Sequence, residues 1–404
     1  MTIPSLEAEP ACTGPERVEA ANPPSSAASD RRLRVTQNLF GDVARSNWDR
    51  LAAGTEWATP FSDWAFHRAW WDAYGSSAHD QTLLVTDDSI GELVGIVPLM
   101  HRHEVEPTDA DTHTKMRQSG SRRLTQVAPT AKAVFFGASY HADYATFLAA
   151  REDQPAVAEA IAEHLAQPAP LDDAHPEPWD VVDLRRLRCG DPAADELAAA
   201  FGRREIAEGW TLNVEREDVC PVTTLPLGGD FDEFLATLGK KSRHEIRRKV
   251  RRAEGVGEIR LTDSADALAD LPEFIDLHQR RWGDDGLFPD TPGGGASRLF
   301  FQRMFEEHPA IRLAFLTVGD RRIAAGVHFR TRDGYLYYNA GVDPDARELS
   351  PGVLMVAAYI QRALAEGCRR MDFLRGNESY KYEWGAVDEP IQRLLVRRDA
   401  EAPG

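Results

Sequence analysis

Side chains able to act as a base, an acid and an anion ligand lie close together in residues 371–385, which read MDFLRGNESYKYEWG. Asp372 lies between apolar residues, and Glu378, Tyr380 and Lys381 follow it. A carboxylate can take a proton from an amine, and a phenol can give one to a leaving group. A buried carboxylate needs a partner, so Asp372 forms either a structural ion pair or part of a site. Lys381 is expected either to pair with Glu378 or to bind an anionic substrate.

A second group of candidates begins a long helix. Residues 349–367 predict a helix with Pro351 in its first turn and Gly367 at its end. The free N–H groups and the positive dipole end at a helix start suit an anion such as pyrophosphate. Gly352 lets the backbone approach such a ligand closely. The candidate anion-binding residues are therefore Ser350, Pro351, Gly352, Val353 and Leu354.

Three further residues are candidates for substrate binding. His328 and Asn339 are polar residues among apolar positions of two predicted strands. Trp71 belongs to the aromatic helix predicted over residues 61–74, which is suited to wall an apolar pocket. For each of them, ordinary packing inside the fold is the competing interpretation.

The elements that position these residues follow a clear order in the second half of the chain. One or two helices over 231–254 and a short strand come first, then two more helices. Strands at 311–318, 322–331 and 335–342 follow and predict an antiparallel meander. The long helix, a strand over 369–374, a short helix and a final strand over 391–397 follow. The first half has a similar order, which predicts a mixed α/β fold of two duplicated halves. The expected division is a disordered tail over 1–30, an N-terminal domain over 31–227 and a C-terminal domain over 228–404.

Three segments of the second half resemble the GNAT acyltransferases, and more narrowly the CelD-like acetyltransferase family, which is related to the FemAB-type aminoacyl transferases. They are the basic helix KKSRHEIRRKVRRAE, the helix start LSPGVLM and the segment MDFLRGNESYKYEWGA. The resemblance implies tandem GNAT-like domains, each with a mostly antiparallel mixed sheet flanked by helices. It implies acetyl-CoA or another acyl-CoA as co-substrate, no metal, and direct attack by a small-molecule or sugar amine. It also implies that backbone N–H groups near Gly341 and Val342 hold the thioester oxygen. Because the first half lacks a Pro-Gly helix start, we expect it to have lost cofactor binding and to help form the acceptor cleft.

The segment from Lys240 to Arg252 carries eight Lys or Arg and one Glu. Its apolar residues recur at helical spacing, so one face of this helix is buried. The charged face either pairs with acidic surface or binds phosphates, as clustered Lys and Arg do. The sequence therefore leaves two alternative functions open: a FemAB-like transferase that uses aminoacyl-tRNA, and a catalytically inactive module in a polysaccharide-related assembly.

Composition excludes several other classes. The chain has 404 residues, 42% of them hydrophobic, and a formal net charge of −18, which disfavours general adhesion to nucleic acid or anionic lipid. No apolar run is long enough for a membrane span, and the N-terminus has no apolar segment typical of a secretory signal. The four cysteines are widely spaced, which favours free thiols in a reducing cytoplasm. No phosphate-loop, zinc-protease or nucleophile-elbow motif occurs.

Overall fold

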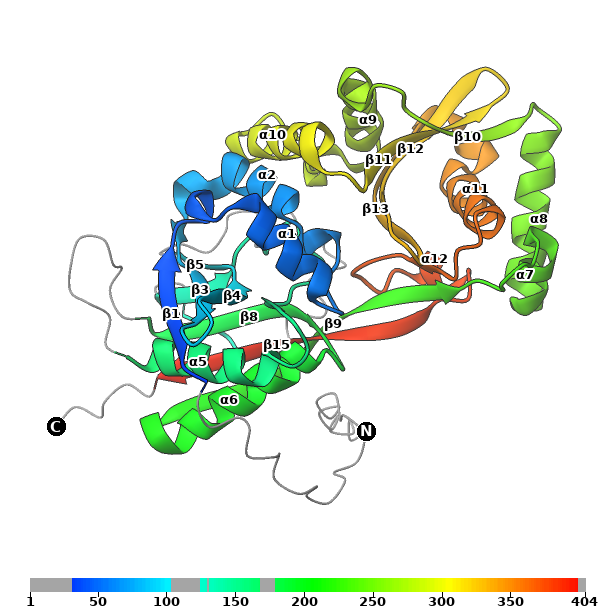
Figure 1. Ribbon diagram of the computed structural model, residues 1–404. Coiled ribbons are helices and arrows are strands. Elements are labelled where there is room, and N and C mark those ends of the chain that lie inside the picture. Colours follow the sequence, from blue (N-terminus) through cyan, green and yellow to red (C-terminus); the bar gives the residue numbers. More distant parts are fainter. Residues whose placement is uncertain (1–30, 103–123, 129–130, 168–178, 399–404) are drawn as a thin grey trace, which may run out of the picture.

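The computed structural model describes residues 31–102, 124–128, 131–167 and 179–398 (Figure 1). The tail expected over residues 1–30 lies outside this part of the chain. The fold is mixed α/β with two sheets, as expected. A four-stranded sheet has the order β1-β3-β4-β7, and an eleven-stranded sheet has the order β10-β11-β12-β13-β14-β9-β15-β8-β6-β5-β2.

The second half contains the predicted meander and the helices around it. Its strands are β10 (Ile259–Asp263), β11 (Ile311–Val318), β12 (Arg321–Arg330), β13 (Gly334–Val342), β14 (Arg370–Asp372) and β15 (Val387–Arg398). Its helices are α7 (Phe231–Thr237), α8 (Lys240–Glu254), α9 (Ala267–Trp282), α10 (Pro292–Glu307), α11 (Pro351–Ala365) and α12 (Ser379–Tyr382). Helix α11 lies along the meander (Figure 1), and its apolar side chains fill a core with those of α7, α8 and β11 to β13.

The strands β13 and β14 run parallel and then separate. Their pairing covers only Gly334–Leu336 of β13 and Arg370–Asp372 of β14. A register shift in the β12–β13 ladder between Val327 and His328 leaves Tyr338 without a partner on β12, which is typical of a β-bulge. The remaining residues of β13 therefore leave β14 and open one edge of the sheet, directly before α11 begins.

The first half builds the small sheet and the other end of the large one. Its strands are β1 (Leu33–Asn38), β2 (His79–Asp80), β3 (Thr82–Asp87), β4 (Glu92–Val97), β5 (Leu99–Arg102), β6 (Ala133–Phe136), β7 (Leu148–Ala149), β8 (Val181–Arg188) and β9 (Trp210–Thr224). Its helices are α1 (Arg45–Gly54), α2 (Trp64–Tyr74), α5 (Gln154–Ala166) and α6 (Pro192–Glu208).

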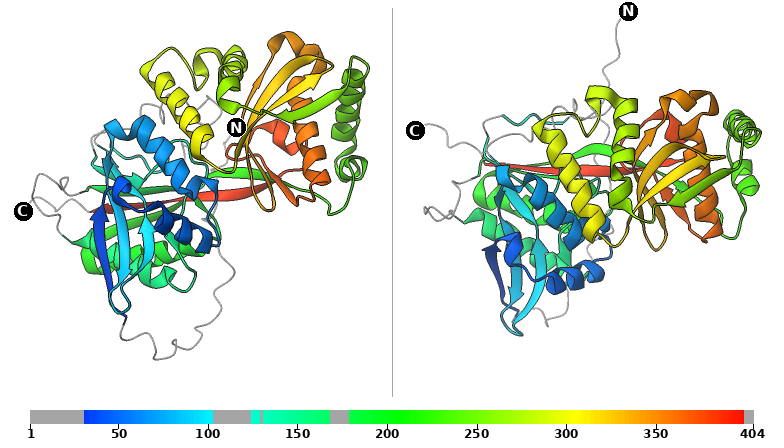
Figure 2. Two further views of the ribbon diagram at one scale, coloured as in Figure 1. Left: turned by 45° about the horizontal axis from the view of Figure 1, so that its top comes forward. Right: turned by 90° about the horizontal axis from the view of Figure 1, so that it is seen from above.

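Two long strands join the halves. Strand β15 pairs with β9 along its whole length and with β8, so the last strand of the chain lies inside the sheet of the first half. Strand β9 also pairs with β14. Figures 1 and 2 show β9 and β15 running side by side from one half to the other. The large sheet is therefore continuous across the expected boundary at residue 228.

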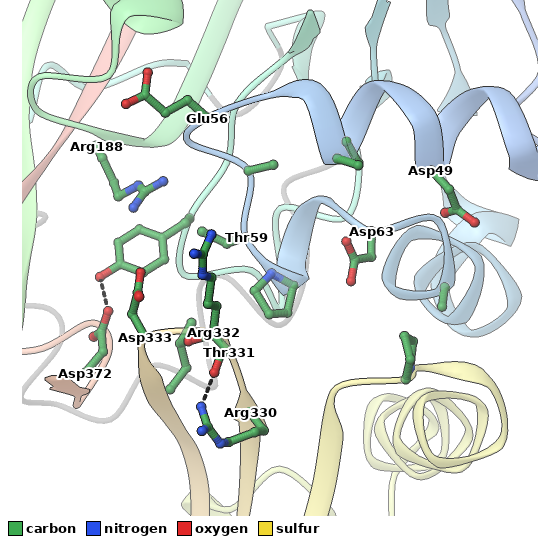
Figure 3. Close-up of a pocket in the computed structure, with 18 of the residues that line it drawn as sticks. Asp49, Glu56, Thr59, Asp63, Arg188, Arg330, Thr331, Arg332, Asp333 and Asp372 are labelled. Carbon is green, nitrogen blue, oxygen red and sulfur yellow. Dashed lines mark hydrogen bonds between the residues drawn. The ribbon is translucent and has the colours of Figure 1, made fainter. Parts of the chain in front are cut away.

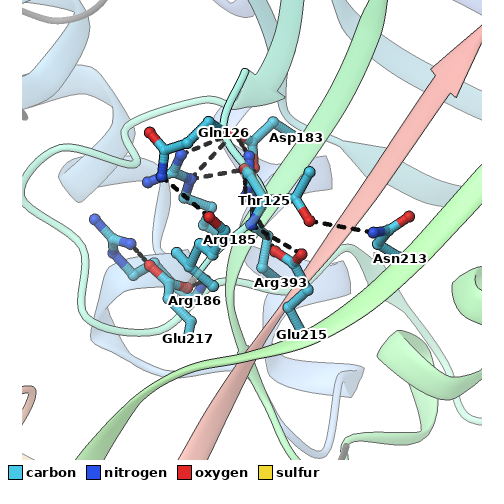
Figure 4. A network of polar contacts seen from close by, with 10 residues as sticks. Thr125, Gln126, Asp183, Arg185, Arg186, Asn213, Glu215, Glu217 and Arg393 are labelled. Carbon is cyan, nitrogen blue, oxygen red and sulfur yellow. Dashed lines mark hydrogen bonds and ion pairs between the residues drawn. The ribbon is translucent and has the colours of Figure 1, made fainter. Parts of the chain in front are cut away.

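A buried polar network holds these strands in register (Figure 4). Arg393 of β15 is 1% exposed, and its guanidinium donates to both carboxylate oxygens of Asp183 at 2.6 and 2.8 Å. It also donates to Glu215 at 3.1 Å and to the Thr125 carbonyl at 2.8 Å. Burial raises the pKa of Asp183, but Arg185 and Arg393 together bring it below its ordinary value. One cation thus links β8, β9 and β15.

Three local predictions from the sequence differ from the structure: a helix over residues 143–167 interrupted near Gln154 and Pro155, a strand over residues 123–128, and a loop over residues 284–295. Residues 143–153 are not helical, because this segment runs extended and the Ala145 N–H donates to the Arg186 carbonyl. The helix begins only at Gln154, where Pro155 occupies its first turn instead of interrupting it. Residues 124–128 form no strand. The glycines after Pro292 belong to α10, whose start is capped by Thr291.

Among the described residues, no helix combines the length and the apolar composition needed to cross a bilayer.

Candidate functional site

A cavity of about 590 Å³ occupies the opening between β13 and the chain that follows β14. Its walls come from the end of β13, the start of α11, the end of α9, and the segment from Phe373 to Trp384. The first half adds Tyr140, His141 and Asp143. The cavity brings together most of the residues predicted from the sequence, namely Asn339, Val342, Ser350, Pro351, Gly352, Val353, Glu378, Tyr380 and Lys381.

The start of α11 presents an open backbone to this cavity. Ser350 has a left-handed backbone, with φ 58° and ψ 56°, and its carbonyl accepts the N–H groups of Val353 at 3.0 Å and Leu354 at 3.2 Å. Two of the expected anion donors are therefore used within the first turn. The N–H of Gly352 has no acceptor in the described part of the chain. A Cβ added at Gly352 would meet no atom within 4 Å, so the space beside its Cα is empty of protein.

Three arginines surround the same helix end. Arg281 of α9 and Arg347 line the cavity, and neither has a carboxylate within 4 Å among the residues described. Arg252 of α8 donates to the Ser350 hydroxyl at 2.9 Å. Because these cations add to the positive end of the helix dipole, this corner of the cavity suits a phosphate or pyrophosphate group.

The loop after β14 is organised by Lys381. This side chain is 2% exposed, and its ammonium donates to the carbonyls of Leu374, Arg375 and Gly376 at 2.9 to 3.0 Å. It also forms an ion pair with Glu378 at 2.9 Å, which is one of the two alternatives that the sequence left open. All of its protons thus have acceptors inside the protein, so Lys381 fixes the loop that presents Glu378 and Tyr380 to the cavity.

The opposite wall is formed by β13 and α9. Asn339 lines the cavity next to His278 of α9, whose pKa burial lowers to about 4, so this imidazole is neutral at physiological pH. Gly341 lies behind the wall, where an added Cβ would be 2.5 Å from the His278 backbone nitrogen. Its role in the structure is to let α9 pack closely against β13.

Replacing Gly341 with alanine is therefore expected to push α9 away from β13. Overpacking of this kind costs about 1–3 kcal/mol of unfolding free energy. Urea unfolding of G341A measures the loss, and G295A, at an exposed glycine of α10 with no atom within 4 Å of an added Cβ, is the matched control. Equal stability of G341A and G295A would contradict the close packing.

The first half contributes a buried polar cluster to the cavity. The His141 ring stacks on Phe300 at 4.1 Å, and its Nε2 lies 2.8 Å from the Tyr74 hydroxyl. The Tyr338 hydroxyl donates to the His141 carbonyl at 2.9 Å, which ties this segment to β13. Asp143 pairs with Arg375 at 3.3 Å, with both side chains below 10% exposure. The expectation that the first half lines the same cleft is therefore met in the geometry.

Besides Gly341, four of the predicted residues do not line this cavity. Asp372 is buried, and it accepts hydrogen bonds from the Tyr144 hydroxyl and the Leu374 N–H, each at 2.8 Å. His328 is buried against Tyr359, with its Nδ1 2.8 Å from the tyrosine oxygen, and burial lowers its pKa to about 3. Leu354 belongs to the core under α11, and Trp71 packs within the aromatic helix α2.

Several residues that line the cavity were not predicted from the sequence. Arg347 and Arg281 occur in ordinary charged segments, and nothing in their local pattern distinguishes them. His141 and Asp143 lie in the segment SYHADY, whose density of polar and aromatic residues was the one available signal. Because these residues are far from α11 in the chain, nothing in the sequence indicated that they share a cavity with it.

Comparisons with known proteins agree with this geometry. Residues 240–382 match the family model described as "Acetyltransferase (GNAT) domain". Among solved structures, FemX superposes with a TM-score of 0.53 at 9% identity, covering 87% of this chain and 96% of FemX. A conserved protein of unknown function from Bacteroides thetaiotaomicron superposes with a TM-score of 0.52 at 10% identity, covering 91% of this chain and 100% of the other. Identities this low show a shared fold alone. No curated protein matches the sequence.

The predicted fold class is thus confirmed, and so is the resemblance to a GNAT domain for residues 240–382.

Proposed function

We propose that this protein is an N-acyltransferase that takes an acyl group from acetyl-CoA or another acyl-CoA and transfers it to an amine. The observation that carries the proposal is the N–H of Gly352, which has no acceptor among the described residues and belongs to a helix start that lines the cavity. Arg281 and Arg347 lie around it without carboxylate partners in the part of the chain that the structure describes. These features together fit the pyrophosphate of a CoA thioester.

The neighbouring residues fit the remaining needs of this reaction. When the amine attacks the thioester carbonyl, a C–N bond forms, the C–S bond breaks and the amine loses a proton. Glu378 lines the cavity as a carboxylate able to take that proton, and Tyr380 is placed to protonate the departing sulfur. Asn339 and the first-half residues His141 and Asp143 would orient the acceptor. A small-molecule amine or an amino sugar is the acceptor class we propose, with the cytoplasm as the compartment.

Calorimetric titration with acetyl-CoA and with a long-chain acyl-CoA tests the proposal directly. We expect saturable binding of at least one of them at a stoichiometry near one, and the tighter ligand then identifies the acyl group. Absence of binding by both would overturn it.

Helix α8 favours a second candidate, an aminoacyl transfer from tRNA. Arg252 joins this helix to the start of α11 through Ser350. Lys240, Lys241, Lys249 and Arg251 have no carboxylate within 4 Å among the described residues, although Arg247 and Arg248 are paired with Asp232 and Glu245. Unpaired positive charge is therefore distributed along α8, whose Arg252 contacts the start of α11, and such charge suits a phosphate backbone.

If tRNA is the donor, its affinity should fall steeply with salt, by about 1,000-fold or more between 50 and 200 mM for six or more phosphate contacts. Filter binding of the wild type and of a K240Q/K241Q/K249Q/R251Q variant measures this effect. We expect the variant to lose most of the salt dependence. Binding that is equally strong in both proteins, or that is independent of salt, would exclude this helix as a tRNA surface.

A further inference from the structure

A second cavity, of about 580 Å³, lies at the junction of the two halves (Figure 3). It is bounded by α1, by residues of the segment 56–65, by the β12–β13 turn at 330–333, and by β14. None of its lining residues also lines the cavity at α11. It is therefore a separate site, and nothing in the proposed acyl transfer uses it.

The floor of this cavity is rigid. The Tyr144 hydroxyl donates to Asp372 at 2.8 Å, and Arg370 lies 3.5 Å from the same carboxylate oxygen while pairing with Glu389 at 2.9 Å. The second carboxylate oxygen of Asp372 accepts the Leu374 N–H. Each polar group on the floor thus has a fixed partner, so a ligand would meet a preformed surface.

Arg188 is the most distinctive residue of the wall. Its guanidinium lies over two aromatic rings, 4.6 Å from the centroid of Trp57 and 5.0 Å from that of Tyr144, and it donates to the Trp57 carbonyl. No carboxylate lies within 4 Å of it in the described segments of the chain. Two rings hold the planar group in one orientation, so its remaining N–H donors are arranged for a carboxylate at little entropic cost.

Both positively and negatively charged side chains line this cavity. Five arginines and five Asp or Glu residues line the cavity, so its formal charge is balanced. Several of them pair with one another or with neighbours, such as Arg45 with Asp49 and Arg330 with Glu366. Asp333, on the exposed turn between β12 and β13, has no cationic partner within 4 Å among the residues that the structure describes. The cavity therefore holds three charged side chains with no partner of opposite charge within 4 Å in the described part of the chain, namely Arg188, Arg332 and Asp333.

We infer that this cavity binds a small molecule that carries both an ammonium and a carboxylate, namely a free amino acid or a dipeptide, whose two ends supply the two charges. Arg188 would bind the carboxylate through two N–H groups, and Asp333 would accept from the ammonium. A purely anionic ligand would meet the carboxylates of the wall, and a purely cationic one would meet the arginines. A zwitterion complements both.

The test is a titration of the full chain with L-alanyl-L-alanine, monitored by ligand-observed NMR. The N-acetylated and the C-amidated forms of the same dipeptide are titrated in parallel. We expect each capped form to bind at least 10-fold more weakly than the zwitterion, because each one lacks one charge. Titration with L-alanine distinguishes the two ligands. Tight binding of alanine indicates a free amino acid, and binding of the dipeptide alone indicates a peptide.

Two variants assign the site. R188Q and D333N are each expected to weaken dipeptide binding at least 10-fold while leaving acyl-CoA binding unchanged, since neither residue lines the other cavity. R34Q, at an exposed arginine of β1 that pairs with Asp88, is the control and should bind as the wild type does. The inference is overturned if the dipeptide does not bind, if its capped forms bind equally well, or if R188Q and D333N both keep full affinity.

Discussion

Replacing Gly352 with tyrosine is expected to weaken acyl-CoA binding by about 30- to 100-fold or more. This is the effect of losing one charge-assisted hydrogen bond, because the ring would occupy the space that the phosphates need. The Gly352 N–H has no acceptor in the described structure, and an added Cβ would point into open space. A large side chain there would fill the corner where the phosphates are expected to lie. G352A is expected to have a smaller effect, because a methyl group leaves most of that space open.

The same substitution should not unfold the protein, since nothing within 4 Å opposes a side chain at this position and helix propensity favours any ordinary residue over glycine. Calorimetric titration gives the affinity, and thermal unfolding gives the stability. The matched control is G295Y, at the exposed glycine in the first turn of α10, which does not line the cavity. An affinity of G352Y equal to that of the wild type and of G295Y would show that the acyl donor binds elsewhere.

The largest expected loss of stability comes from Arg393. Replacing it with methionine removes two hydrogen bonds from the buried Asp183, which keeps Arg185 as a partner, and removes the cation shared by β8, β9 and β15. Breaking a buried ion pair from one side costs about 3–5 kcal/mol, because the remaining charge stays desolvated. Urea unfolding monitored by tryptophan fluorescence measures the free energy of R393M.

Two further variants distinguish the contribution of this ion network to stability from the general effect of removing an arginine from a strand. R34M removes a half-exposed arginine whose single ion pair with Asp88 is expected to contribute at most about 1 kcal/mol. The double variant R393M/D183N should lose less than the sum of its single changes, since the two side chains interact directly. A loss in R393M as small as that in R34M would mean that the network does not hold the two halves together.

The two cavities are lined by neighbouring residues of the same two chain segments. Asp143 and Arg375 line the cavity at α11, while Tyr144 and Asp372 line the cavity between the halves. The Tyr144–Asp372 hydrogen bond is part of the structure between them. Asp372, which the sequence offered as a possible base, therefore supports this wall.

The local pattern of the sequence was sufficient for most elements of the second half. The meander and α11 with Pro351 in its first turn were expected from periodicity and helix caps, and both are present. The sequence predicted one or two helices over 231–254, and the structure has two. The structure brings Ser350 to Val353, Glu378 and Tyr380 into one cavity, and the local signals had located the elements that carry them. They succeeded because helix starts and strand ends are determined by neighbouring residues, and these neighbours lie within one continuous stretch of chain.

Other features were decided by tertiary contacts alone. The role of Lys381 depends on three carbonyls that the folded loop turns toward it, and Asp372 faces Tyr144, which lies 228 positions away in sequence. The Arg393 network and the entry of β15 into the sheet of the first half likewise join residues from distant segments. Sequence alone determined which residues begin helices and strands. The direction in which a side chain faces, and the partner it meets there, depended on how segments far apart in the chain pack together, for which the local pattern carries no signal.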